Sequence, residues 1–192
     1  TAGLHGRRTY ILDFFMNIIP TSIPDLVLIE PRVFDDRRGY FLETFSQENY
    51  AKCGINLPFV QDNESCSELG AIRGLHFQAP PFEQGKLVRV IKGAVLDVAV
   101  DIRVGSPTYG QHVAVELNAR NKRIFWVPPG FAHGFQTLEQ DTVFVYKCTG
   151  YYNKASEGGL MWNDQDLQVQ WLPVDEPIIS DKDQILSSFK DF

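Results

Sequence analysis

The segment KLVRVIKGAVLDVAVDIR, residues 86–103, decides the fold class. Between Leu96 and Ile102 every second residue is apolar, which is the two-residue period of a β-strand. The residues between them, such as Asp97, would then share a polar face. Gly93 interrupts the segment, so we expect a hairpin or a bent pair of strands.

Short strand-like runs continue on both sides of this segment, separated by turn sequences such as DDRRG, SPTYG and PPG. They cover residues 26–34, 40–45, 112–117, 123–127 and 142–148. Many short strands with regularly spaced turns indicate an all-β antiparallel sandwich or barrel, and a jelly roll is the preferred form. Residues Ser46–Cys53 predict a short helix with Ser46 as its N-cap. The chain after Trp171 is expected to pack loosely or helically against the barrel.

Length, charge and cysteine content bound the function. A chain of 192 residues suits one domain, and its net charge of −6 argues against a nucleic-acid binder. No run approaches the roughly 20 apolar residues of a membrane helix. Three dispersed cysteines predict reduced thiols, with neither a disulfide framework nor a structural zinc site. We expect a cytoplasmic protein without a membrane partner.

The first fifteen residues, TAGLHGRRTYILDFF, do not fit a signal peptide, because Asp13 interrupts the apolar run and no small-residue cleavage site follows. We expect residues 1–15 to be a tag-derived extension. Residues 16–192 are then expected to form a single domain.

Two histidines stand in contexts that suit chemistry. His76 lies in RGLHFQAPP and His133 in VPPGFAHGF, each among apolar residues and near glycine or proline. Either residue is a hydrogen-bonded core histidine, or the two line the mouth of a barrel. A metal site is disfavoured, because Gly74 and Gln78 stand where a closely spaced second histidine would be needed. A histidine without co-ligands is available as an acid or base.

Basic residues lie close to these histidines. Lys86 and Arg89 fall on opposite faces of a regular strand, so one of them points inward and needs a carboxylate or an anionic ligand. Asp97 is a candidate carboxylate, and a solvated outer face is the alternative for these groups. Arg73 and His76 would also lie on opposite faces, unless Gly74 forms a bulge.

Taken together, the motifs resemble the dTDP-4-dehydrorhamnose 3,5-epimerase family. The matching stretches run in order from about residue 23 to 186: FDDRRGYFLETF (34–45), FVQDNESCS (59–67), RGLHFQ (73–78), QGKLVRV (84–90), GAVLDVAVDIR (93–103), SPTYGQ (106–111), WVPPGFAHGF (126–135), VYKCTGYY (145–152), EGGLMWND (157–164) and ISDKD (179–183). The resemblance implies a cupin-type jelly roll that works without metal or other cofactor. It also implies a homodimer in which N-terminal strands cross to the partner.

The resemblance implies that the protein inverts C3 and C5 of dTDP-4-keto-6-deoxy-D-glucose, giving dTDP-4-keto-L-rhamnose. His76 matches the general base, Asp183 the aspartate that orients it, Tyr146 the proton donor and Lys86 the lysine near the C4 oxygen. The remaining matches are contacts to the sugar or nucleotide: Arg73, His133, Asp97, Arg38, Phe34, Glu43, Gln61, Asn63 and Tyr152.

Three alternatives to this function stay open. A related epimerase that inverts only C3 or only C5 would use the same acid–base groups. A non-catalytic sugar-binding jelly roll is a second alternative, disfavoured by the presence of His76, Lys86, Tyr146 and Asp183 together. A metal-dependent cupin enzyme is disfavoured by the number of ligands.

Overall fold

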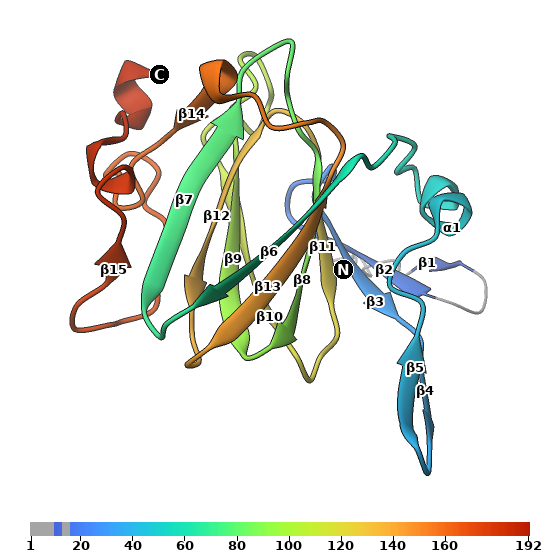
Figure 1. Ribbon diagram of the computed structural model, residues 1–192. Helices are drawn as coiled ribbons and strands as arrows, with labels where there is room; N and C mark the ends of the chain where they lie inside the picture. The colour runs from blue at the N-terminus through green and yellow to red at the C-terminus, as the bar shows by residue number, and fades with distance from the viewer. Residues whose placement is uncertain (1–9, 13–15) are drawn as a thin grey trace, which may run out of the picture.

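The computed structural model describes residues 10–12 and 16–192. Two β-sheets lie face to face and enclose the core (Figure 1). Sheet I has the order β1-β2-β3-β11-β8-β13-β6, from β1 (Tyr10–Leu12), β2 (Met16–Pro20), β3 (Val27–Pro31), β11 (Ile124–Val127), β8 (Lys86–Lys92), β13 (Thr142–Cys148) and β6 (Gln61–Ser67). Sheet II has the order β10-β9-β12-β7-β14, from β10 (His112–Asn118), β9 (Ala94–Asp101), β12 (Phe131–Thr137), β7 (Ala71–Gln78) and β14 (Glu157–Gly159).

Neighbouring strands within each of these two orders run antiparallel, and short β15 (Ile178–Ile179) adds to β7 in parallel. Buried side chains from both sheets fill the space between them, among them Val88, Ala99, Phe125 and Phe144. The all-β, cupin-type jelly roll expected from the sequence is therefore confirmed.

The segment that decided the fold class behaves as a bent strand pair and not as a hairpin. Strand β8 pairs with β11 and β13 in sheet I, whereas β9 pairs with β10 and β12 in sheet II. The chain passes from one sheet to the other at Gly93, where φ is +80° and an added Cβ would lie 2.2 Å from Thr142 Oγ1. A residue with a side chain does not fit this crossing.

Of the two environments that the sequence left open for the polar face of residues 94–103, the buried one is present and the solvated alternative is wrong. Asp97, Ala99 and Asp101 are each 0% exposed, and the opposite face of β9 packs in a second apolar cluster with Leu160 and Leu167. The carboxylates are buried because partners from other segments satisfy them. Asp97 lies 2.8 Å from Nε2 of His133 on β12, and Asp101 accepts from the hydroxyl groups of Ser106 and Thr108 at 2.6 Å each.

The predicted short helix is confirmed as α1 (Gln47–Lys52), with Ser46 as its N-cap accepting from the backbone N–H of Asn49. It covers the outer face of sheet I through Tyr50. None of the helices among the described residues is long and apolar enough to cross a membrane. Of the expected tag-derived extension, residues 1–15, only 10–12 are described, as strand β1, and the rest lies outside the described residues.

Two segments at the ends of the chain matter for the site. Strands β4 (Val33–Asp36) and β5 (Gly39–Leu42) form a hairpin that projects away from the barrel (Figure 1). The C-terminal segment, residues 178–192, runs along β7 and contains β15 and the short 3-10 helices η2 (Asp183–Ile185) and η3 (Phe189–Asp191). The segment is held by a strand pairing, and it is helical only in η2 and η3. The expectation of helical packing is therefore met only in these two short turns.

Candidate active site

A hollow of about 460 Å³ opens between the two sheets. Its wall from sheet II carries Arg73 and His76 on β7 and His133 on β12. Its wall from sheet I carries Lys86 on β8 and Tyr146 on β13. The geometry thus brings imidazole, ammonium and phenol groups to one cavity from opposite sides, in the size range of small-molecule sites.

His76 forms a close pair with a carboxylate from the C-terminal segment. Its Nε2 lies 2.7 Å from Oδ1 of Asp183, and Oδ2 of Asp183 accepts from the backbone N–H of Gly74 at 3.2 Å. Burial raises the pKa of Asp183, but the hydrogen bond and charge of His76, with the Gly74 N–H, outweigh burial and hold this pKa below its ordinary value. The pair therefore contains an ionised carboxylate at neutral pH.

A bulge at Gly74 places Arg73 and His76 on the same face of β7. His133 of β12 stands opposite His76, and Phe135 stands opposite Arg73, so one residue of β12 faces two of β7. Gly74 has φ +123°, and an added Cβ would lie 2.6 Å from Cα of Gly134. The bulge that the sequence left open is thus present, and it needs glycine.

Lys86 and Tyr146 lie in the cavity wall, where burial affects both groups. Burial lowers the pKa of Lys86, although nearby Cys148, Asp97 and Glu157 act in the opposite direction. Its ammonium group makes no hydrogen bond or ion pair to the described part of the chain. Burial raises the pKa of Tyr146, so the phenol keeps its proton at neutral pH. As the strand period predicts, Arg89 lies on the opposite face of β8, in a different hollow.

His133 pairs with the buried carboxylate that the sequence singled out. Its Nε2 lies 2.8 Å and 3.0 Å from the two oxygens of Asp97. The His133 side chain is 7% exposed and that of Asp97 0%, whereas the His76 side chain is 30% exposed. His133 is therefore both a hydrogen-bonded core histidine and part of the cavity wall.

An adjoining hollow of about 340 Å³ shares His76, Lys86 and Tyr146 with the first. It is also lined by Gln61, Asn63 and Tyr152, three of the expected substrate contacts. The backbone N–H of Tyr152 donates to Oε1 of Gln61 at 3.0 Å, which ties the two walls of this hollow together.

Sequence reasoning missed several residues that line these hollows. Glu157 accepts from the phenol of Tyr152 at 2.9 Å and pairs with Lys182. Burial raises the pKa of Glu157, but the hydrogen bonds from Lys182 and Tyr152 outweigh burial and lower it. Ser65 lines the larger hollow, and its buried hydroxyl has no partner among the described residues. Glu157 and Ser65 both lie in motifs that carry the family resemblance, and this was the sequence signal that could have identified them.

Three expected contacts lie away from the cavity in this chain. Phe34 and Arg38 belong to the projecting β4–β5 hairpin, where Arg38 pairs with Asp36. Glu43 follows the hairpin and accepts from the Asn49 side chain at 2.7 Å. The structure therefore does not bring these three residues to His76 within one chain.

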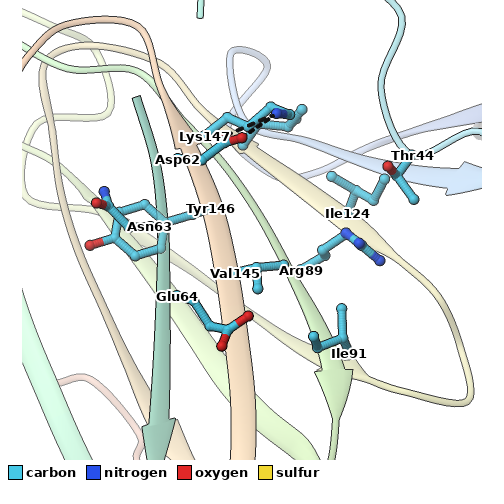
Figure 2. Close-up of a pocket in the computed structure, with 11 residues that line it drawn as sticks. Thr44, Asp62, Asn63, Glu64, Arg89, Ile91, Ile124, Val145, Tyr146 and Lys147 are labelled. Carbon is cyan, nitrogen blue, oxygen red and sulfur yellow. Dashed lines mark hydrogen bonds and ion pairs between the residues drawn. The ribbon is translucent and has the colours of Figure 1, made fainter. Parts of the chain in front are cut away.

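A third hollow, of about 400 Å³, lies mostly on the other side of β8 and β13, although Asn63 and Tyr146 also contribute to its lining. Figure 2 shows Tyr146 and Asn63 on one side of these strands and Arg89 and Ile91 on the other. Lys147 pairs there with Asp62 at 2.8 Å. In the described residues no group of three His, Cys, Asp or Glu side chains is placed to hold a metal ion.

Comparisons with known proteins point to one family. The family model for dTDP-4-dehydrorhamnose 3,5-epimerase matches residues 20–191. A dTDP-4-dehydrorhamnose 3,5-epimerase of Shigella flexneri is 51% identical over 169 residues, covering 88% of this chain and 93% of that protein. The structure of the epimerase RmlC from Legionella pneumophila Philadelphia 1, in complex with dTDP-4-keto-L-rhamnose, is 48% identical with a TM-score of 0.89, covering 91% of this chain and 93% of that one. ChmJ, a 3'-monoepimerase from Streptomyces bikiniensis in complex with dTDP-quinovose, is 34% identical with a TM-score of 0.83, covering 88% and 86%.

Proposed function

The chain belongs to the dTDP-4-dehydrorhamnose 3,5-epimerase family, and from this premise we propose that its cavity inverts C3 and C5 of dTDP-4-keto-6-deoxy-D-glucose. The protein is an epimerase, an enzyme of the isomerase class. One observation carries the assignment to this cavity: His76 on one sheet and Lys86 and Tyr146 on the other line the same hollow. A reaction that exchanges protons on two faces of a sugar ring needs this two-sided arrangement.

His76 is the base that removes the protons. C3 and C5 both flank the C4 ketone, so loss of a proton from either carbon gives an enolate. An ionised carboxylate only accepts hydrogen bonds, so Asp183 holds the ring proton on Nε2 and leaves Nδ1 as the basic nitrogen. Asp183 also stabilises the imidazolium that forms, and a base of this kind contributes on the order of 10²–10⁴-fold.

Lys86 stabilises the enolate oxygen. Its ammonium lies in the cavity wall without a bonded carboxylate among the described residues, so its charge is available where negative charge develops. A fixed donor of this kind stabilises the transition state by about 3–4 kcal/mol. The charges of Asp97 and Glu157 raise the pKa of Lys86 and so offset part of the lowering caused by burial.

Tyr146 returns a proton on the face opposite His76. The two residues reach the cavity from different sheets, which is the placement that inversion requires. Burial keeps the phenol protonated and thus ready to donate. Each inversion at one carbon moves one proton to His76 and one proton from Tyr146. His76 then gives its proton to solvent and Tyr146 regains one from solvent before the second carbon reacts.

The nucleotide side of the substrate falls to the other cavity residues. Arg73 is held by Ser67 through Nε at 3.0 Å and is placed to bind an anion such as the diphosphate. Gln61, Asn63 and Tyr152 line the adjoining hollow, where Tyr152 offers a ring for stacking on thymine. His133, held by Asp97, contacts the sugar from the floor of the cavity.

A homodimer with exchanged N-terminal strands would complete the site. Phe34 and Arg38 project from the barrel on the β4–β5 hairpin (Figure 1), and Phe34, Tyr40 and Phe41 are 38%, 57% and 68% exposed. Exposed aromatic residues on a projecting hairpin suit burial against a second copy of the chain. Arg38 and Glu43 would then act in the partner's cavity.

The catalytic proposal is tested by NMR of the dTDP-keto-sugar in D₂O. Deuterium is expected at both C3 and C5 with the wild type, and at neither with His76→Asn. Product analysis after coupling to a 4-reductase is expected to give the inverted sugar. Deuterium at one carbon alone would indicate a monoepimerase, and binding without any exchange would indicate a sugar-binding protein; either result overturns the proposal.

The dimer proposal has its own test. Light scattering gives the mass in solution, and mixed dimers of His76→Ala with Arg38→Ala test whether sites are shared. If Arg38 serves the partner's cavity, the inactive variants restore activity when mixed, because one site per mixed dimer has both residues intact. A monomer, or the absence of complementation in a mixed dimer, would contradict the exchange.

A further inference from the structure

Asp183 reaches His76 from a segment that is held at two places. Before Asp183, β15 pairs with β7 over two residues, Ile178 and Ile179. After it, the backbone N–H of Met161 donates to the carbonyl of Ser187 at 2.9 Å. The N–H of Phe189 donates to Oδ2 of Asp164 at 2.8 Å. The position of Asp183 therefore depends on contacts on both sides of it.

Asp164 is built into the fold and lies outside both hollows. It is 9% exposed, and its Oδ1 accepts from the N–H groups of Asp166 and Leu167 at 2.9 and 3.0 Å. Leu167 is 3% exposed in the apolar cluster on the outer face of sheet II. One oxygen of Asp164 thus holds a turn fixed to the barrel, and the other holds the C-terminal segment. Asp164 is also the last residue of the motif EGGLMWND, and the proposed reaction steps give it no role.

We infer that Asp164 is a positioning residue of the reaction: it anchors residues 187–189 so that Asp183 stays in contact with His76 and Gly74. The inference rests on the proposed function, because its effect on turnover is transmitted through the Asp183–His76 pair. Without the Phe189 bond, the chain after Asp183 keeps the Met161–Ser187 backbone bond but loses its contact with the Asp164 carboxylate, so Asp183 is held less firmly on that side. The imidazole is then oriented less well, and turnover falls while the cavity walls stay in place.

The first test is Asp164→Asn, with Asp191→Asn as the control. Asparagine keeps one oxygen for the turn at 166–167, but turns an N–H₂ group toward the N–H of Phe189. Asp191 lies on the same segment, and among the described residues its carboxylate accepts only from the Ser188 hydroxyl, at 2.6 Å, so its change tests charge alone. Asp164→Asn is expected to lower kcat on the order of 100-fold with little change in KM, and Asp191→Asn to leave kcat unchanged.

A matched pair at Phe189 removes the same hydrogen bond from its other end. Phe189→Ala keeps the N–H, whereas Phe189→Pro loses it. Phe189 opens η3 after Ser188 with φ −72° and ψ 156°, a backbone that accepts proline at the next residue. Phe189→Pro is expected to match Asp164→Asn in kcat, and Phe189→Ala to lie much closer to the wild type. Equal kcat values for the two Phe189 variants would overturn the inference. This test remains valid even if the Asp164→Asn protein does not fold.

Two further readouts separate positioning from general destabilisation. In an Asp183→Asn background, Asp164→Asn is expected to change kcat by no more than about twofold, because its route of action is already lost. The amide of Gly74, bonded to Asp183, is expected to lose protection from hydrogen exchange in Asp164→Asn. The inference is overturned if the losses in kcat from Asp164→Asn and Asp183→Asn multiply in the double variant. It is also overturned if the hydrogen-exchange protection of the Gly74 amide is unchanged in a folded Asp164→Asn protein. The Gly74 readout needs no turnover, so it stays decisive if the proposed function fails.

Discussion

Replacing Gly74 with alanine tests whether the bulge in β7 builds the active site. The residue has φ +123°, and an added Cβ would lie 2.6 Å from Cα of Gly134 and 2.8 Å from the carbonyl oxygen of His133. Both neighbours are backbone atoms of β12, so no side-chain rotation relieves the contact. The strand must either shift away from β12 or lose the bulge.

The expected cost follows from these two effects. A residue with a side chain in this φ region costs about 1–3 kcal/mol. Forcing extra volume into a packed site adds about 1–3 kcal/mol. The sum, about 2–6 kcal/mol, is a large part of a typical stability of about 5–15 kcal/mol. Because the bulge keeps Arg73 and His76 on one face, the protein that still folds is expected to lose on the order of 100-fold in kcat/KM.

Urea unfolding of Gly74→Ala beside Gly39→Ala separates the two effects. Gly39 has φ +128° and nothing within 4 Å of an added Cβ, so its variant has only the backbone cost of about 1–3 kcal/mol. The stability of Gly74→Ala is expected to fall further, and its activity is compared with that of the wild type. If the two variants were equally stable and Gly74→Ala kept wild-type turnover, the clash and the role of the bulge would both be refuted.

Other residues give sharper tests of single roles. Lys86→Met is expected to lower kcat on the order of 10²–10³-fold in a coupled assay, because it removes the charge at the enolate oxygen; wild-type turnover would contradict that role. Tyr146→Phe is expected to reduce inversion while deuterium exchange at C3 or C5 partly survives, and NMR showing both unaffected would remove Tyr146 from the mechanism. Burial raises the pKa of Asp101, but hydrogen bonds led by the one from Arg103 outweigh burial and lower this pKa in the folded protein. The ionised carboxylate therefore stabilises the fold at any pH above its unfolded-state pKa. This stabilisation is lost as the pH falls through the lower folded-state pKa. Asp101→Asn is therefore expected to cost about 3 kcal/mol at pH 7 in urea unfolding, with the difference from the wild type shrinking below about pH 4; a difference that stays constant down to about pH 2 would contradict this linkage.

The sequence pattern predicted the strands whose environment is simple. Alternation located β8, β9 and β13 to within two residues, and the glycine at 93 marked the crossing between sheets. It could not decide whether the face of β9 with Asp97 and Asp101 meets water, because the partners of these carboxylates include residues from other strands and loops. A polar residue in an alternating strand is exposed only when no distant group satisfies it, and alternation carries no information about that group.

The strands that carry both histidines had no readable period. All seven residues of β12 are buried, and β7 is bulged at Gly74, so neither alternates. Asp183 was invisible for another reason: it lies in a polar terminal segment, and only the docking of that segment on β7 buries it to 4% exposure. The family resemblance supplied it, since the physical cause is a contact between residues 107 positions apart.

Sequence context also could not choose between the two histidines, and the structure supplies the physical criterion. His76 and His133 stand opposite each other on neighbouring strands, and each is bound through Nε2 to a carboxylate. Orientation by a carboxylate is thus common to both and decides nothing. Exposure decides: the His76 side chain is 30% exposed and that of His133 is 7% exposed. A base must reach a proton on the substrate, so the more accessible His76 ring is suited to abstraction, while the buried His133 ring with Asp97 is suited to a fixed hydrogen bond.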